Sequence, residues 1–325
     1  MRKSPITATL AAMPRPAVDV VVPFAGGGEE LERLSASLTK IKLQPGDSIV
    51  IVDNTPGREG TPRGPGAAVP ILHESTRTTP GYARNRGAER GAAPWLLFLD
   101  ADTDPPEDLL DLYFDPEPDP RTAVLGGGVR DEPVPPDAPA AARYAYIRAA
   151  TSQEDSFRFG EWGFPKTANA AFRRSAFEAV GGFREDIRTA EDADLSFRLR
   201  AAGWKIERRE HAVVTHLSRS TVRAFVVQRA LYGAGGAWLE RNYPGSFPAR
   251  RRPGLVLWAS RTCLRRLARA ARSRDRDEAI WALFEPLEAV VWELGRSLPN
   301  ERPLSLAAWM RALGRIRGPR DAVRI

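Results

Sequence analysis

The chain has 325 residues, of which 42% are apolar and 27% are charged, so it can form one large folded domain with an appendage. It contains no uninterrupted apolar run of about 18 residues, and the sequence therefore predicts no membrane-spanning helix. Its single cysteine, Cys263, excludes an internal disulfide and a cysteine-based zinc site, and it fits a cytoplasmic location.

The net charge of +7 is concentrated in the C-terminal third of the chain. Residues 219–325 carry 21 arginines and 9 acidic residues, a surplus of +12, whereas residues 1–218 have a balance of −5. This asymmetry favours an acidic partner surface for the last third, unless the arginine content only reflects a GC-rich genome. At the other end, residues 1–17 are predicted to form a flexible arm and not a signal peptide, because prolines interrupt their short apolar stretch.

In the N-terminal third, apolar runs alternate with helical periodicity, a pattern typical of parallel strands joined by helices. Strands are predicted at 18–23, 48–53, 69–73 and 95–99, with helices from Glu29 and from Gly81. Three glycines at 26–28 lie where a dinucleotide-binding loop would lie. Their spacing is not G-x-G-x-x-G, so we reject a dehydrogenase.

Arg84 and Arg86 fall near the start of the helix predicted from Gly81. Cations at a helix N-terminus oppose the helix dipole, so we interpret both side chains as binding an anion together with the free backbone N–H groups. The alternative is a pair of solvated charges.

Three aspartates follow the predicted strand 95–99, at positions Asp100, Asp102 and Asp104. The strand is a continuous apolar run, as expected for burial on both faces, and unpaired carboxylates at the end of such a strand are unfavourable. A divalent cation that holds a pyrophosphate would compensate them, because Mg²⁺ and Mn²⁺ prefer carboxylate and phosphate oxygens. The alternative is that Asp102 or Asp104 caps a helix beginning near Pro105.

The middle of the chain is predicted to form a helix at 107–114, a strand at 123–129, a helix at 138–152 and a strand at 168–172. Before the last strand, Trp162 and three phenylalanines lie among glycines in the irregular segment 156–166. Aromatic residues in such a loop either stack on the apolar face of a ligand or fill the edge of a core.

Three acidic residues, Glu191, Asp192 and Asp194, open another predicted helix. A structural interpretation is available, in which Thr189 is the N-cap with Asp192 at the third helical position. Asp194 is also spaced to pair with Arg198 one turn later. Three acids in four residues exceed what a helix cap requires, and we favour a catalytic role once the family resemblance described below is included.

The C-terminal part begins with a predicted strand bounded by His211 and His216. Helices are then predicted at 219–240, 255–273 and 279–297.

The second of these helices has the composition of a helix that lies in a membrane interface. Residues 261–276 include seven arginines, and the apolar side is formed by Trp258, Leu264, Leu267 and Ala271. We therefore predict peripheral membrane contact through residues 255–298. The alternatives are packing on the preceding domain or formation of a homodimer. No nucleic-acid-binding signature is present, so nucleic acid is not expected as a partner.

Seven short motifs occur in an order that resembles a known enzyme family. They are Val21-Val22-Pro23-Phe24, Asp53, Ala83-Arg84-Asn85, Asp100-Ala101-Asp102, Thr167-Ala168-Asn169-Ala170, Gly181-Gly182-Phe183 and Glu191-Asp192. Together they resemble the inverting GT-A glycosyltransferases, in particular family 2, and the fourth is a DxD motif. The resemblance implies an α/β fold of GT-A type, with a Rossmann-like, mostly parallel open sheet flanked by helices.

The same resemblance divides the chain into three parts. After the arm at 1–17, residues 18–218 are expected to form a GT-A nucleotide-sugar-binding catalytic domain. Residues 219–325 are expected to form a basic helical C-terminal region.

The resemblance implies a nucleotide-diphosphosugar donor and a divalent cation. The residues expected at the nucleotide and the donor sugar are Pro23, Phe24, Asp53, Arg84, Asn85 and Asp100. Asp102 is expected to bind Mn²⁺ or Mg²⁺. His216 is a second candidate ligand, with a purely structural role as the alternative.

The residues expected at the acceptor side come from the later part of residues 18–218. Asp192 is expected to be the general base, with Glu191 beside it. Trp162 and Asn169 are expected to contact the acceptor.

The sequence therefore predicts a metal-dependent inverting glycosyltransferase that moves a sugar, with a UDP-sugar favoured, to the hydroxyl of an unknown acceptor. It is expected in the cytoplasm, with contact at the inner face of the membrane kept open. The alternatives are an inactive nucleotide-sugar-binding relative and a scaffold that binds an acidic surface through its basic C-terminal region.

Overall fold

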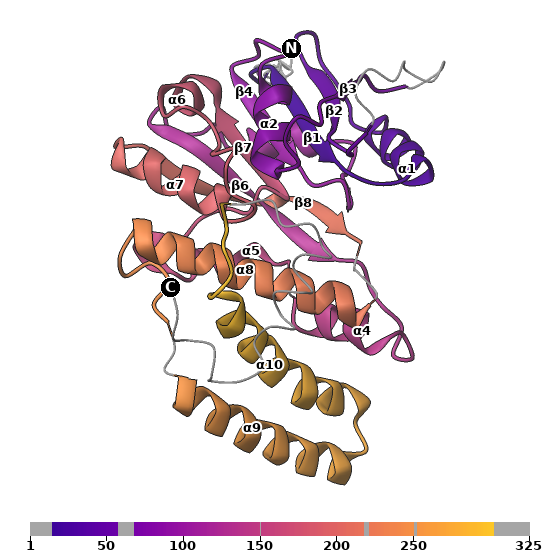
Figure 1. Ribbon diagram of the computed structural model, residues 1–325. Helices are drawn as coiled ribbons and strands as arrows, with labels where there is room; N and C mark the ends of the chain where they lie inside the picture. Colours follow the sequence, from indigo (N-terminus) through magenta and orange to yellow (C-terminus); the bar gives the residue numbers. More distant parts are fainter. Residues whose placement is uncertain (1–14, 58–67, 150, 218–220, 250–251, 302–325) are drawn as a thin grey trace, which may run out of the picture.

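An eight-stranded sheet organises the N-terminal two thirds of the protein, and three long helices follow it (Figure 1). The computed structural model describes residues 15–57, 68–149, 151–217, 221–249 and 252–301. The strands are β1 (Val18–Phe24), β2 (Ser48–Asp53), β3 (Ile71–His73), β4 (Trp95–Leu99), β5 (Thr103–Asp104), β6 (Thr122–Asp131), β7 (Asn169–Arg173) and β8 (Lys205–His216). The shorter helices are α1 (Gly28–Leu38), α2 (Pro80–Ala88), α3 (Leu109–Tyr113), α4 (Ala140–Ile147), α5 (Gln153–Phe157), the 3-10 turn η1 (Gly160–Trp162), α6 (Arg174–Ala179) and α7 (Glu191–Ala201).

The strand order is β3-β2-β1-β4-β7-β6-β8-β5. Strands β1 to β4 run parallel to one another, as predicted, and β6 runs parallel to β8. Strand β7 lies antiparallel between β4 and β6, so those two strands point the same way. The carboxyl ends of β1, β2, β4, β6 and β8 therefore meet at one edge of the sheet, the edge where open sheets of this kind bind ligands.

Helices cover both faces of the sheet, and β4 lies at its buried centre. On one face, Leu97 and Leu99 share a core with residues of α1 and α3. On the other face, Leu96 and Phe98 share a core with residues of α2, α6 and α7. The continuous apolar run predicted a strand buried on both faces, and this prediction is confirmed.

Several predicted helices are shorter than expected. The helix predicted at 107–114 is α3, whose N-cap is Asp108. Upstream of it, Asp104 lies in the short strand β5 and accepts a hydrogen bond from Lys40 at 3.1 Å. The alternative that Asp102 or Asp104 caps a helix is therefore wrong.

The helix predicted at 138–152 is divided into α4 and α5, and Ala149 between them has a left-handed backbone with a φ of 48°. Most of the predicted arm at 1–17 lies outside the described residues. Of the remainder, Arg15 is held by Asp47 at 2.7 Å.

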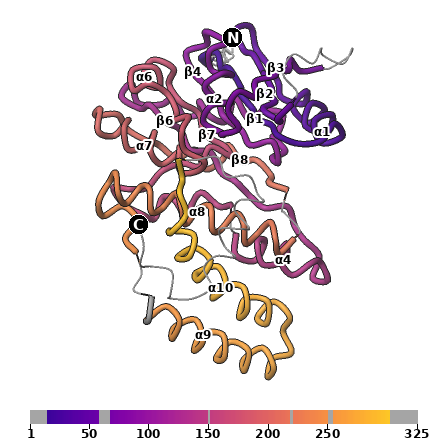
Figure 2. Tube along the Cα trace, in the orientation of Figure 1, coloured from indigo at the N-terminus to yellow at the C-terminus, as the bar shows by residue number. Residues whose placement is uncertain are grey.

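The predicted C-terminal helices are confirmed as α8 (Val222–Asn242), α9 (Arg252–Ser273) and α10 (Arg276–Gly295). Helices α8 and α10 pack against α4 through a cluster centred on Tyr144, Phe225 and Phe284. Helix α9 packs on α10 and lies outermost, away from the sheet (Figures 1 and 2). Within the described residues, no helix combines the length and apolar character needed to span a membrane.

We predict that Phe98→Ala lowers the free energy of unfolding by about 3–5 kcal/mol, because it opens a cavity in the core. Phe98 is fully buried, and its ring lies 5.0–5.8 Å from those of Phe172, Phe177 and Phe183. Chemical denaturation measures the change. Phe159→Ala is the matched control, because Phe159 is 46% exposed and should contribute about 1 kcal/mol or less. Equal losses in the two variants would contradict this packing account.

Candidate active site

The buried guanidinium of Arg84 joins three elements at the carboxyl edge of the sheet. Arg84 lies in α2 and is only 4% exposed. Its Nη2 donates to Asp100 Oδ1 at 2.8 Å, just after β4, and its Nη1 donates to Glu191 Oε1 at 2.6 Å, at the start of α7. The anion predicted to share this helix terminus with Arg84 is thus supplied by the protein's own carboxylates.

Arg86 does not reach the same place. Its guanidinium pairs with Glu89 at 2.6 Å and with Glu185 at 3.3 Å. The predicted joint anion site of Arg84 and Arg86 is therefore wrong, because side chains two residues apart on a helix point in different directions.

The start of α7 is defined by backbone geometry. Its N-cap is Ala190, which has a left-handed backbone with a φ of 71° and makes no side-chain capping bond. Residues held in this conformation are strained and persist where the surroundings enforce it. In α8, Gly235 lies so close that an added Cβ would be 2.8 Å from Thr189 and 3.0 Å from Ala190. The predicted cap by Thr189 is wrong, and Glu191 and Asp192 are the first two residues of the helix.

Asp192 lies beside Glu191 in this strained turn. Burial raises the pKa of its carboxyl to about 7, and the negative charges of Glu191 and Asp100 act in the same direction. The backbone N–H of Ala193 and the charge of Arg84 oppose the shift. The site therefore holds a carboxyl group that changes protonation near neutral pH.

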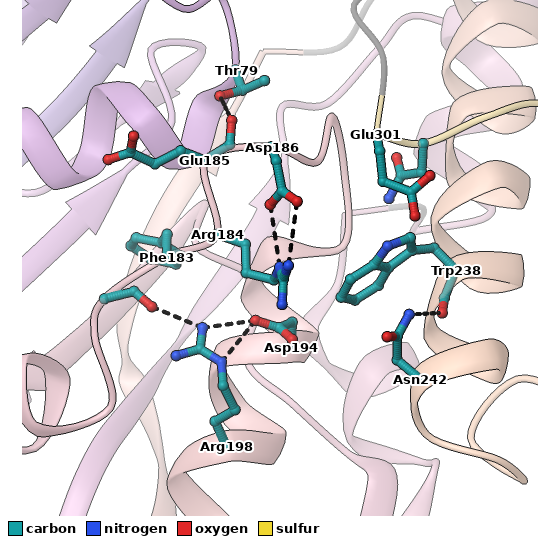
Figure 3. A network of polar contacts seen from close by, with 12 residues as sticks. Thr79, Phe183, Arg184, Glu185, Asp186, Asp194, Arg198, Trp238, Asn242 and Glu301 are labelled. Carbon is teal, nitrogen blue, oxygen red and sulfur yellow. Dashed lines mark hydrogen bonds and ion pairs between the residues drawn. The ribbon is translucent and has the colours of Figure 1, made fainter.

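Asp194, the third acid of the helix, has a structural environment. It is buried, and its carboxylate accepts hydrogen bonds from Arg198 and from the hydroxyl of Tyr243, both at 2.7 Å. Figure 3 shows the Asp194–Arg198 pair next to the segment 183–186, where Arg184 pairs with Asp186 and lies over Trp238 of α8. This network fixes the first turns of α7, and the predicted pair of Asp194 with Arg198 is confirmed.

Asn85 also belongs to this supporting network. Its amide donates to the carbonyl of Phe183 and accepts from the Phe183 N–H, both at 2.9 Å. It donates further to Glu185 at 3.0 Å. Since these bonds hold the segment 183–186 against α2, the position of Asn85 favours a structural role over the predicted contact with the nucleotide.

A second group of polar side chains lies at the ends of β6 and β8. The imidazole Nε2 of His216 is 3.4 Å from Asp102, and its Nδ1 is 3.1 Å from Asp131. Strand β8 bulges, since Gly127 pairs with Arg209 but Gly128 pairs with Val213. This bulge sets the register that places His216 opposite Asp131.

The carboxylates of this second group favour a positive charge on His216. Burial lowers the pKa of His216, but the carboxylates of Asp102 and Asp131 outweigh burial and raise it to about 9. Asp131 is 6% exposed and also accepts a hydrogen bond from Thr151 at 2.8 Å. Its second oxygen is buried without a hydrogen-bond partner.

The chemistry of these donors fits a divalent cation. A neutral His216 that donates its Nδ1–H to Asp131 presents the Nε2 lone pair toward Asp102, as metal-binding histidines do. Among the described residues, no group of three or more histidine, cysteine or acidic side chains has metal-binding spacing. Two protein ligands with phosphate oxygens are nevertheless an ordinary arrangement for Mg²⁺ and similar ions.

The residues expected at the nucleotide lie where β1 and β2 end. Phe24 is buried, and Pro23 beside it is half-buried. Asp53 is fully buried, accepts a hydrogen bond from the N–H of Thr55 at 3.0 Å and lies 3.3 Å from His73 at the end of β3. These residues occupy the same sheet edge as Asp100 and Asp102.

Comparison with known proteins assigns this arrangement to a family. Residues 95–284, more than half of the chain, match the family model described as glycosyl transferase family group 2. The chain belongs to this family.

Two groups of curated relatives are similar to this family 2 chain. The pre-mycofactocin glycosyltransferase of Mycobacterium tuberculosis is 27% identical over 231 residues, which are 70% of this chain and 48% of that protein. The chain thus spans about half the length of this relative. The O-antigen chain rhamnosyltransferase WbaN of Salmonella anatum is 37% identical over 87 residues, which are 26% of this chain and 27% of that protein.

A solved structure supports the fold. The mannosyltransferase PcManGT from Pyrobaculum calidifontis, in complex with GDP-Man and Mn²⁺, matches with a TM-score of 0.53 at 18% identity. The match covers 93% of this chain and 80% of that chain. The predicted GT-A fold of this family 2 chain is confirmed.

The two residues predicted at the acceptor have different surroundings. Trp162 is half-buried, and its ring lies 5.0 Å from that of Phe197 and 6.3 Å from that of Tyr243. Asn169 is fully buried and accepts from the hydroxyl of Tyr113 at 2.6 Å. It also donates to the carbonyl of Ala212 at 2.7 Å. Both ends of this amide are occupied by hydrogen bonds within the sheet, so the position of Asn169 favours a structural role.

Two residues of this site were missed by the sequence interpretation. Asp131 orients His216, and His73 contacts Asp53. Both end a strand at the carboxyl edge of the sheet, which is the signal that would have identified them.

We predict that Glu191→Gln lowers the pKa of Asp192 by roughly one unit, because it removes a neighbouring negative charge. The amide oxygen can still accept the hydrogen bond from Arg84. Carbon NMR of aspartate carboxyls across pH measures the change. Glu32→Gln, an exposed position of α1 on the other face of the sheet, is the control for charge and should leave the titration unaltered. An unchanged or higher pKa in Glu191→Gln would contradict this electrostatic coupling.

Proposed function

We propose that this family 2 glycosyltransferase moves a sugar from a nucleotide-diphosphosugar to an acceptor hydroxyl, with inversion at the anomeric carbon. The observation that carries the proposal is the Arg84 bridge, which holds Asp100 and the Glu191–Asp192 pair in one site. This bridge brings Asp192, whose carboxyl group can accept a proton, close to the acids that follow β4.

Asp192 is the proposed general base. A base is most effective when its pKa is close to the working pH, and the pKa of Asp192 is raised to about 7. Its carboxylate takes the proton of the acceptor hydroxyl while the hydroxyl oxygen forms its bond to the anomeric carbon. The bond to the nucleotide diphosphate breaks on the opposite face, and a single displacement of this kind inverts the centre.

The donor is proposed to lie along the carboxyl edge of the sheet, with its nucleotide at Pro23, Phe24 and Asp53 and its sugar near Asp100. A carboxylate such as Asp53 accepts an N–H from a uracil edge, which favours a UDP-sugar. Guanine also offers N–H donors, and the similar PcManGT structure contains GDP-Man. Both nucleotides therefore belong in a donor screen.

Asp102 and His216 are the proposed ligands of Mn²⁺ or Mg²⁺, with Asp131 as the residue that orients His216. Such an ion offsets the charge that develops on the departing diphosphate. Asp102 supplies a charged oxygen, and His216 supplies its Nε2 nitrogen. The contact of Nδ1 with Asp131 selects the tautomer of the imidazole ring.

The alternative of an inactive relative is disfavoured by the intact acids at 100, 102, 191 and 192. The acceptor, the contact of Trp162 with it, the cytoplasmic location and a homodimer remain predictions. So does membrane contact through residues 255–298.

We predict that Asp192→Asn lowers turnover by a factor on the order of 10²–10⁴, because an amide cannot take the proton. Release of UDP or GDP from a panel of nucleotide sugars measures turnover, and calorimetry measures nucleotide affinity, which should be nearly unchanged. Asp137→Asn is the control, because this carboxylate is exposed and lies in the loop between β6 and α4, outside the network of Figure 3.

Two results would contradict this role. Turnover of Asp192→Asn equal to that of the unaltered protein would remove Asp192 from the chemistry. A loss of nucleotide affinity at an unchanged rate would make Asp192 a binding residue and leave Glu191 as the better base candidate.

A further inference from the structure

Helix α9 presents an apolar stripe to solvent. Val256 is 62% exposed, Leu257 is 52% exposed and Leu264 is 69% exposed. Ala268 and Ala271 are also exposed and fall on the same face as Leu257 and Leu264, because the spacing follows the helical repeat. A helix that only supported a folded domain would turn these leucines inward.

The opposite face of α9 packs on α10 and uses some polar residues to do so. Leu255 and Ala270 are buried there. Arg266 pairs with Glu285 at 3.1 Å and lies over the ring of Trp281. The face packed on α10 thus contains an arginine, whereas the leucines Leu257 and Leu264 lie on the solvent face. Packing against α10 therefore does not explain why these leucines are exposed.

Arginines lie within and beside the apolar stripe. Arg261, Arg265 and Arg272 are exposed, and they form no ion pair with any described residue. Arg266 and Arg269 instead pair with Glu285 and Glu278 of α10. Leu267, which the sequence assigned to the apolar side, is half-buried, so the outward face differs from the predicted one.

The positive charge of α9 limits which kind of partner can cover its apolar face. The helix contains six arginines and no acidic residue. If a second copy of the protein paired its α9 with this one, the arginine rows would face each other without acids between them. An anionic surface has the complementary charge, and helices with an apolar stripe flanked by arginines bind at the interface of such membranes.

We infer that α9 lies on an anionic lipid bilayer, with Leu257 and Leu264 inserted among the acyl chains and Arg261, Arg265 and Arg272 at the lipid phosphates. Each arginine near an anionic surface contributes about fivefold in affinity. Burial of each leucine contributes about tenfold or more. Several such contributions give reversible attachment that salt weakens. The inference is independent of the proposed sugar transfer.

The test is co-sedimentation of the full chain with vesicles of phosphatidylcholine alone and of phosphatidylcholine mixed with phosphatidylglycerol, at low and high salt. The full chain should sediment with the anionic vesicles at low salt and much less at high salt. Removing the three arginines together, with Arg261→Gln, Arg265→Gln and Arg272→Gln, should weaken binding by on the order of 100-fold. Replacing both leucines, with Leu257→Gln and Leu264→Gln, should weaken it by a similar factor.

Matched controls carry the same changes elsewhere on the surface. They are Arg33→Gln, Arg90→Gln and Arg121→Gln as an exposed arginine triple, and Leu43→Gln for a leucine that is 50% exposed. These variants should bind vesicles like the unaltered protein. Thermal unfolding should be similar in all variants, since every altered side chain is exposed.

Three outcomes would overturn the inference. One is no binding to anionic vesicles, and another is equal binding to neutral and anionic vesicles. The third is a dimer in sedimentation velocity that Leu257→Gln and Leu264→Gln dissociate, which would make α9 a face between two copies of the chain.

Discussion

The arrangement of the site depends on one buried cation, the guanidinium of Arg84. Its removal from water is compensated by two carboxylates, Asp100 at 2.8 Å and Glu191 at 2.6 Å. Removing one partner of such a buried pair typically costs about 3–5 kcal/mol, because the other charge is left uncompensated. The end of β4 and the start of α7 are therefore tied to α2 through a single side chain.

Other features of the site follow from this tie. Since Glu191 is held by Arg84, its charge remains next to Asp192 and helps to raise the pKa of that carboxyl. The left-handed residue Ala190 directs the first turn of α7 toward Arg84, and Gly235 of α8 leaves room for that turn. The C-terminal helices thus contribute to the site through contact with the backbone before α7, although none of the proposed site residues lies in them.

Much of the architecture could be predicted from local patterns, but the pairings within the site could not. The apolar run at 95–99 identifies the central strand, and acids at strand ends identify the functional edge. Arg84 and Glu191, however, are separated by 107 positions, and the bulge in β8 that sets His216 opposite Asp131 has no local signature. Asn169 matched a family motif, yet only its hydrogen bonds to Tyr113 and Ala212 show that the amide serves the sheet.

In the proposed function, a nucleotide diphosphate and a metal ion meet at the ends of β4 and β8. Anomalous X-ray diffraction from crystals grown with Mn²⁺ and a nucleoside diphosphate tests this most directly. We predict a manganese peak within bonding distance of Asp102 and His216, with the diphosphate beside it and the base near Asp53. A manganese ion or nucleotide bound elsewhere, with Asp102 and His216 making no contact to the ion, would contradict this proposal.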